Sequence, residues 1–210
     1  MRRVGFAVIV LALATAGAAS AQETAGAGRV EIGAFPAGGT FFTKGSTSKG
    51  SEPNFKDYAL GASAMVNLNR FVGVEGEIGA GIGLRQTLDV NQSIITNIKG
   101  PNTLAYNGNV VYNPGGSDRS LVPYLTGGIG GLTLFSRTEL VPLGLPNDKT
   151  FLSENVGGGL RWFANEHFGV RGDYRFIAVN GKETSPSFFG LNQTRHGHRV
   201  YGGVLFTFGH

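Results

Sequence analysis

The sequence contains no cysteine and carries little charge. Asp, Glu, Lys and Arg together make up 15% of its 210 residues. Without Cys an exported chain has no disulfide framework, so its stability must come from a strand ladder and its packing. The chain also has no basic cluster beyond its first three residues, which excludes a nucleic-acid partner.

The chain lacks an apolar run long enough for a transmembrane helix, which needs about 20 residues. The run from Val4 to Thr15 is shorter, and it follows the positive start Met1-Arg2-Arg3. Ala19-Ser20-Ala21 then matches the small-x-small cleavage pattern. We therefore expect residues 1–21 to be a cleaved signal peptide for export through the periplasm, not a membrane anchor. A short periplasmic segment, residues 22–28, follows.

Glycine, in contrast, is abundant. The chain has 35 Gly, where roughly 7% of residues is usual. These glycines occur inside apolar stretches such as Gly157-Gly158-Gly159, and neither a Pro-rich run nor a Gly-X-Y repeat accompanies them. Gly inside strands marks bends and close backbone approach, which the curved strands and narrow lumen of a small barrel require.

Eight stretches have the alternating pattern of β-strands. They are residues 29–42, 55–68, 71–86, 103–112, 121–135, 151–163, 168–179 and 198–208. The gaps between them alternate long and short, as in a barrel with loops on one side of a membrane and turns on the other. The predicted fold is all-β: an eight-stranded antiparallel up-and-down transmembrane β-barrel, residues 29–210, whose first strand pairs with its last.

Four strands, at residues 55–68, 71–86, 168–179 and 198–208, each carry one apolar face and one face of glycines and charges. In residues 71–86, Val74 and Ile78 share the apolar face, whereas Glu75 and Glu77 lie on the other. The charges nearly balance, which suits a paired network inside the barrel. The predicted lumenal network contains Glu31, Asp57, Glu75, Glu77, Arg85, Arg161, Arg171, Asp173, Arg175 and Arg199. A soluble lipocalin-like binder, with the apolar face inside, is the inverted alternative.

Aromatic residues collect near strand ends, which favours the membrane orientation. The predicted interfacial belt on the side of the short turns contains Phe71, Tyr112, Tyr124, Trp162, Phe168 and Phe208. The fifth strand is ambiguous, because Val122, Tyr124, Leu132 and Leu134 favour one register whereas Leu125 and Ile129 favour the other. Its register therefore stays open at this point.

Four glycine- and aromatic-rich stretches carry a resemblance to a known family. They are residues 122–130, 156–163, 168–176 and 201–208, the last ending in Val204-Leu205-Phe206-Thr207-Phe208. With them the chain resembles the small outer-membrane β-barrels, the OmpA-like and opacity-protein group. The resemblance implies residence in the outer membrane of a Gram-negative cell. Members typically end in Phe, whereas here Gly209-His210 follow Phe208.

Chemical sites are sparse in the sequence. His196 and His198 are spaced to share a strand face, but no further metal ligand accompanies them. Ser185 and Ser187 lie in the same region without a nucleophile motif. We therefore expect no catalytic, cofactor or metal site. The long gap at residues 87–102, with three isoleucines, is expected to extend a strand or form a short helix.

The expected function is a structural or adhesin-like surface role without catalysis. The long loops are the expected place of that role, because loops carry binding function disproportionately. The expected partners are outer-membrane lipid and the assembly machinery of that membrane, with an external ligand left unidentified. A lipid-modifying enzyme and a narrow pore remain the alternatives within the membrane.

Overall fold

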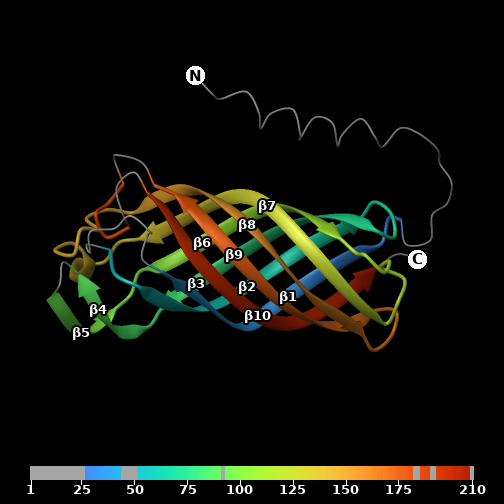
Figure 1. Ribbon diagram of the computed structural model, residues 1–210. Helices are drawn as coiled ribbons and strands as arrows, with labels where there is room; N and C mark the ends of the chain where they lie inside the picture. The colour runs from blue at the N-terminus through green and yellow to red at the C-terminus, as the bar shows by residue number, and fades with distance from the viewer. Residues whose placement is uncertain (1–26, 44–51, 91–92, 182–184, 190–192, 209–210) are drawn as a thin grey trace, which may run out of the picture.

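The computed structural model describes residues 27–43, 52–90, 93–181, 185–189 and 193–208 (Figure 1). The predicted signal peptide, residues 22–26 and Gly209-His210 lie outside the described residues. In the described part of the chain, no helix is long and apolar enough to cross a membrane.

Eight long strands form the main body of the protein. They are β1 (Val30–Phe42), β2 (Phe55–Asn67), β3 (Val72–Gly83), β6 (Asn102–Tyr112), β7 (Leu121–Phe135), β8 (Lys149–Phe163), β9 (Phe168–Asn180) and β10 (Thr194–Phe208). Two short strands, β4 (Arg85–Val90) and β5 (Ser93–Lys99), form a separate hairpin. A single 3-10 turn, η2 (Thr138–Leu140), lies between β7 and β8.

The eight long strands close into one antiparallel barrel. Their order around the ring is β1-β10-β9-β8-β7-β6-β3-β2, and β10 returns to pair with β1. This confirms the predicted fold class. Closure follows from backbone chemistry, because a sheet edge exposed to lipid would leave N–H and C=O groups without partners.

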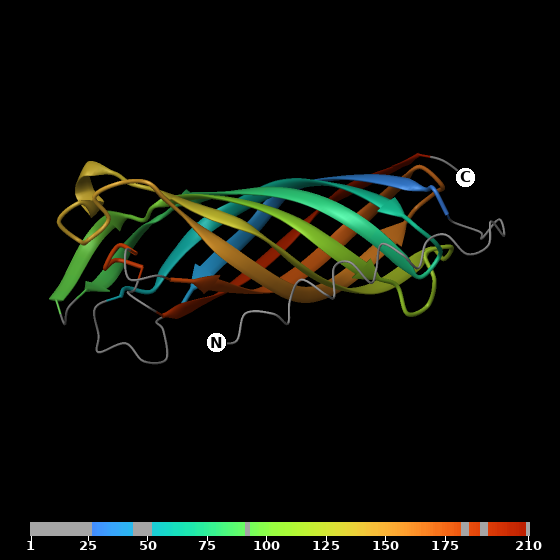
Figure 2. The same cartoon turned by 90° about the horizontal axis from the view of Figure 1, so that it is seen from above.

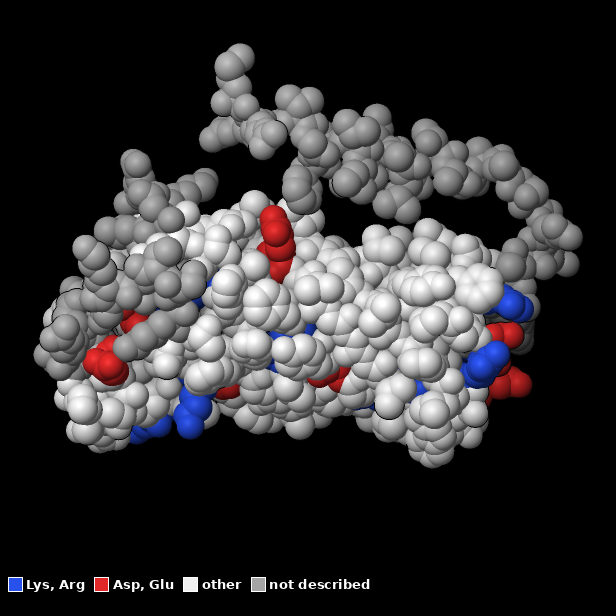
Figure 3. All heavy atoms as spheres, in the orientation of Figure 1, with Lys and Arg blue, Asp and Glu red and all other residues white. Residues whose placement is uncertain are grey.

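The two ends of the barrel differ, as the alternating gaps predict. Figures 1 and 2 show the start of β1 and the end of β10 at the end that carries the short turns. The β4–β5 hairpin projects at the opposite end, beside the long connection that contains η2. The wall between the two ends is an uncharged surface over most of its visible face (Figure 3).

The third strand ends earlier than the sequence pattern suggests. It stops at Gly83, and the chain then turns into β4 instead of continuing to residue 86. A Cβ atom at Gly83 would lie 2.0 Å from the carbonyl oxygen of Gly100, so glycine is required where the hairpin returns to the barrel. Residues 87–102 thus contribute most of a separate β-hairpin.

The fifth strand, β7, has the register that places Leu125 and Ile129 outside. Their exposed fractions are 59% and 51%, whereas Val122 and Leu134 are fully buried. The second set of apolar residues therefore faces the lumen. Both faces of this strand are largely apolar, which is why its alternation alone did not decide the register.

Close strand packing explains two of the strand glycines. A Cβ atom at Gly130 would lie 1.9 Å from the carbonyl oxygen of Tyr106 on β6. One at Gly157 would lie 2.0 Å from the carbonyl oxygen of Tyr174 on β9. Any side chain at these positions would push neighbouring strands apart.

Candidate functional site

The interior of the barrel is the best-defined polar site, and β3 and β9 build its centre. These strands lie on opposite sides of the ring, with three strands between them in either direction. Glu75 and Glu77 point inward from β3, and Arg171, Asp173 and Arg175 point inward from β9. Because strand side chains alternate, residues spaced by two along each strand all reach the same interior.

Arg175 is the most connected cation of this interior. Its Nη2 lies 3.0 Å from Glu75 Oε1 and 3.2 Å from Glu77 Oε2. Its Nε lies 2.7 Å from Asp173 Oδ1, and its Nη1 donates to Asn155 Oδ1 at 2.9 Å. The guanidinium therefore ties three carboxylates together across the lumen.

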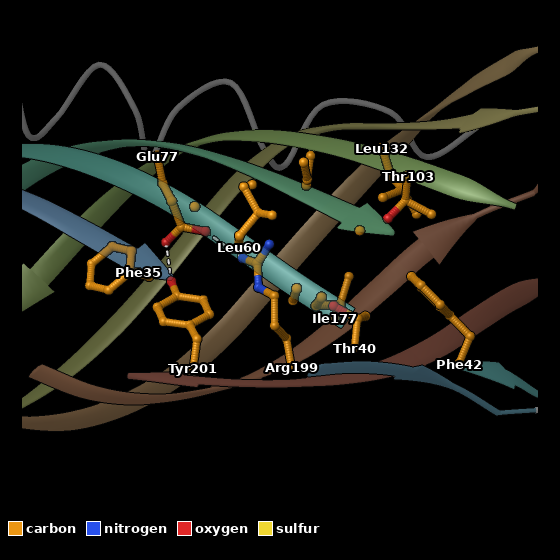
Figure 4. A pocket seen from close by; sticks show the side chains of 16 residues that line it. Phe35, Thr40, Phe42, Leu60, Glu77, Thr103, Leu132, Ile177, Arg199 and Tyr201 are labelled. Atoms are coloured by element: carbon orange, nitrogen blue, oxygen red, sulfur yellow. Dashed lines mark hydrogen bonds and ion pairs between the residues drawn. The ribbon is translucent and has the colours of Figure 1, made fainter. Parts of the chain in front are cut away.

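Arg171 and Arg199 complete the arrangement. Arg171 pairs with Glu75, and its Nη2 lies 2.7 Å from Asp173 Oδ2. Arg199 pairs with Glu77, which also accepts a hydrogen bond from the hydroxyl of Tyr201 (Figure 4). We refer to Glu75, Glu77, Asp173, Arg171, Arg175 and Arg199 as the central network. Its three carboxylates match its three guanidinium groups.

Glu31 and Arg161 form a separate ion pair of 2.7 Å. Asn67 Nδ2 donates to Glu31 at 3.0 Å, and Arg161 also donates to Asn113, which follows the end of β6. Both charged side chains are almost fully buried. The pair therefore adds a further polar layer to the interior of the barrel.

Asp57 is buried but has no cation. The hydroxyl of Thr103 donates to its Oδ2 at 3.1 Å, and Oδ1 has no hydrogen-bond partner among the described residues. No ion pair involves Asp57 in the described part of the chain, in contrast to the other four predicted lumenal carboxylates. The predicted charge balance thus fails at this position.

Arg85 does not lie in the lumen, so its predicted place is wrong. It is exposed at the start of β4, where its Nη1 donates to the backbone oxygen of Asn97 at 3.1 Å. The physical reason is the break after Gly83, which takes the chain out of the barrel before Arg85 is reached.

Five of the six predicted interfacial aromatics lie on the outside of the turn side, and Tyr124 does not. Phe71, Tyr112, Trp162 and Phe208 are exposed, and Phe168 is half-buried against Phe206. Tyr124 is only 3% exposed and points into the lumen, where its hydroxyl donates to Asp173 and accepts from Arg171 Nε at 2.7 Å. The register of β7 turns this side chain inward.

An apolar cap fills the barrel at the end of the long loops. The cluster combines barrel residues with Leu88 from β4, Leu140 and Leu145 from the η2 connection, and Phe188 and Phe189 from the segment before β10. Its barrel members include Phe42, Phe55, Leu132, Leu134, Phe151, Ile177 and Val179. Loop residues therefore fold back into the mouth and exclude water from it.

Arg195 lies buried within this cap and is absent from the predicted site. Its Nη1 donates to the carbonyl oxygen of Phe188 at 2.8 Å, and its Nε donates to that of Thr43 at 3.2 Å. Its guanidinium also stacks 5.0 Å from the ring centres of Phe55 and Phe189. One cation therefore fastens the last loop and the end of β1 to the cap.

A small cavity separates the central network from the cap (Figure 4). Its volume is about 20 Å³, which is room for about one water molecule. Thr40, Phe42, Thr103, Leu132, Arg199 and Tyr201 are among its lining residues. This cavity between the polar and apolar layers is too small for a substrate.

The two candidate histidines lie on the outer face of β10, not in the interior. His198 Nδ1 lies 2.8 Å from the hydroxyl oxygen of Tyr174. His196 packs against the ring of Phe176 at 5.2 Å. No three His, Cys, Asp or Glu side chains come together as a metal site within the described ranges.

The chain matches the model of a known protein family over most of its length. The family model of the outer membrane protein β-barrel domain matches residues 6–196. A comparison with curated protein sequences finds no match.

Solved structures with the same fold include Neisserial surface protein A, which is 13% identical with a TM-score of 0.56. That alignment covers 86% of this chain and 96% of the other. The outer membrane protein OprG from Pseudomonas aeruginosa is 19% identical with a TM-score of 0.51, over 89% of this chain and 99% of the other. The likeness to these structures is one of fold. The family match spans most of a chain that closes into an eight-stranded barrel, so the protein belongs to the outer membrane protein β-barrel domain family and resides in that membrane.

Proposed function

We propose that this protein is a closed barrel that anchors and presents its external loops at the cell surface, with a structural or adhesin-like role. It neither conducts solutes nor catalyses a reaction. The observation that carries the proposal is the double closure of the lumen, by the central network and by the apolar cap.

The loop end supports a role at the surface. The β4–β5 hairpin projects beyond the barrel (Figure 1), and Ile94 near its tip is 75% exposed. An apolar side chain at this position contributes nothing to the apolar cap. The hairpin is therefore the part of the described loops that is best placed to contact a partner.

The proposed partners follow from the same architecture. The apolar wall contacts outer-membrane lipid, and the assembly machinery of that membrane inserts the chain after export by its signal peptide. Insertion through such machinery fits a barrel whose strands cannot enter lipid one at a time without exposing unpaired backbone groups.

The two alternatives within the membrane have less support. A lipid-modifying enzyme needs an activated nucleophile beside a base, whereas the polar partner of His198 is Tyr174 on the outer wall. A narrow pore needs a continuous path, whereas the space between the two closures holds about one water molecule.

Conductance in planar bilayers tests the closed lumen. Mature protein refolded into the bilayer is expected to give no current steps above those of protein-free lipid, because both closures block the axis. A porin in the same lipid serves as the positive control. Sustained current steps from the wild-type protein would refute the closed lumen.

Surface labelling tests the presentation of the loops. The chain has no Cys, so Ile94→Cys introduces a single reactive thiol at the hairpin. A membrane-impermeant maleimide should label it on intact cells. Asp118→Cys, an exposed position on the turn side, is the matched control and should react only after lysis. Equal labelling of both on intact cells would contradict the proposal.

A further inference from the structure

A single acidic side chain interrupts the apolar outer wall in the middle of β8. Glu154 is exposed between Leu152 and Val156, whose exposed fractions are 50% and 59%. On the neighbouring strands it pairs with Ile129 and Ala178.

The position of Glu154 along β8 places it in the hydrocarbon. Thr150, four residues toward the loops, meets the hydroxyl of Thr133 at 2.8 Å and begins the polar rim. Strands rise about 3.3 Å per residue and tilt about 40°, so Glu154 lies about 10 Å below that rim. Trp162 lies eight residues toward the turns, about 20 Å away by the same measure. An ionisable group at such a depth is costly and marks a functional site with a partner.

No partner for Glu154 exists within the described part of the same barrel. No ion pair or side-chain hydrogen bond of the described residues involves it. On β9, the nearest polar side chain of the outer wall is Asn180, two residues from Ala178, and it accepts a hydrogen bond from Thr194 at 3.2 Å. The next polar groups in that direction are His196 and His198 of β10. They are two strands away, and two strand spacings are about 10 Å, which is too far for a hydrogen bond.

The other ring nitrogen of His198, Nε2, can donate a hydrogen bond to a group outside its own barrel. The hydroxyl of Tyr174 lies 2.8 Å from its Nδ1. When that hydroxyl donates, the ring hydrogen is on Nε2, the other nitrogen. The ring of Phe176, the cross-strand partner of His198 on β9, lies 5.5 Å from the His198 ring in an edge contact.

We propose that the outer face of β8, β9 and β10 is a homodimer interface, in which Glu154 of each copy accepts a hydrogen bond from His198 of the other. The strand register of β8, β9 and β10 shows where a two-fold axis would pass. Glu154 pairs with Ala178 and His198 pairs with Phe176, so the midpoint between Glu154 and His198 falls on β9 between Phe176 and Ala178.

A two-fold axis along the membrane normal at that midpoint brings Glu154 of each copy opposite His198 of the other, provided that the two side chains lie at the same depth. Each dimer therefore contains two Glu154–His198 contacts, as an isologous interface requires. Ala178 lies beside the axis, opposite Phe176, and is small, and small residues let membrane-embedded backbones approach closely. The inference concerns assembly in the membrane and is independent of the role proposed for the loops.

Cysteine cross-linking at the axis tests the dimer. Ala178→Cys leaves Glu154 and His198 intact, and it is the only thiol in the chain. In lipid vesicles under mild oxidation we expect a disulfide-linked dimer on a non-reducing gel. Ala80→Cys on β3, on the opposite side of the ring, is the matched control and should remain monomeric.

The contribution of the proposed contact is tested in the same background. Adding Glu154→Gln to Ala178→Cys should lower the cross-linked yield by up to about sevenfold, because two membrane hydrogen bonds of about 0.6 kcal/mol each are weakened. The exchange Glu154→His with His198→Glu should restore it. A heat-modifiable gel shift verifies that each variant forms a barrel.

Three results would overturn the proposal. One is a cross-linked yield for Ala178→Cys no higher than for Ala80→Cys, and another is a yield unchanged by Glu154→Gln. The third needs no cysteine: sedimentation of the wild-type protein in detergent as a monomer of the same mass as Glu154→Gln. That last result would favour a bound cation as the partner of Glu154.

Discussion

At the scale of single residues, burial decides what each charge contributes. Arg175 and Asp57 are both buried within the barrel, but Arg175 contacts three carboxylates whereas Asp57 contacts one hydroxyl. Breaking a buried ion pair by removing one partner costs far more than removing an isolated buried charge. The two residues therefore respond to substitution in opposite ways.

Arg175→Met should destabilise the barrel by about 3–5 kcal/mol, because Glu75, Glu77 and Asp173 lose a shared cation inside the lumen. Urea unfolding in lipid vesicles measures the free energy. Arg85→Met, at an exposed arginine outside the lumen, should change it by less than about 0.5 kcal/mol. Equal losses for the two variants would contradict the assignment of the central network.

Asp57→Asn should leave stability unchanged or raise it by about 1 kcal/mol at neutral pH, since the amide removes a buried charge that has no cation. The amide oxygen can still accept from Thr103. Asp173→Asn should cost about 3 kcal/mol in the same urea titration, because it breaks contacts to Arg171 and Arg175. A large loss for Asp57→Asn would indicate a cation partner at this carboxylate.

At the scale of elements, the barrel strands were predictable because their signal is local. Alternation with a period of two and glycines within the runs identify all eight strands to within a few residues. The ends are less accurate: β3 stops at Gly83, and β10 begins at Thr194, four residues before the expected start at His198. Arg195 lies in that added segment, which is why it was missed.

Interior packing was predictable only in part. The charges of the central network follow from alternation, since each lies on the Gly-rich face of its strand. Tyr124 and the apolar cap do not, because β7 is apolar on both faces and the cap joins loop residues that are far apart in sequence. Such contacts depend on the closed barrel mouth, which no single segment encodes.

Gly157→Ala should prevent or slow barrel formation, because its Cβ would lie 2.0 Å from the carbonyl oxygen of Tyr174 and separate β8 from β9. Gly172→Ala is the matched control on β9, since a Cβ there meets no atom within 4 Å. The folded fraction is read from the heat-modifiable gel shift after refolding. Similar folded fractions would argue against close strand packing as the reason for Gly157.

At the scale of the whole molecule, the two closures are separate in structure and should be separable by experiment. The cap combines loop residues with barrel residues around Arg195, whereas the central network is made of barrel-strand residues alone. Disturbing the cap should therefore alter the loops and leave the barrel closed.

Replacing Phe188 and Phe189 together by Ser should release the segment before β10 from the cap. We expect at least about tenfold faster proteolysis within residues 181–193, because about 2 kcal/mol or more of apolar packing is lost. Bilayer recordings of the same variant should still show no current, since the central network remains. Current steps from this variant would place the only effective closure in the cap.

The seam between β1 and β10 joins the two most distant parts of the described chain, as in the pairing of Glu31 with Thr207. Pairing of this kind has a high contact order, which makes barrel formation slow compared with local folding. Synthesis of the first seven strands cannot complete the barrel, and any shorter product has two open edges. The ring therefore closes only once the last strand is present, and a product that stops before β10 keeps the backbone groups of β1 and β9 without their partner.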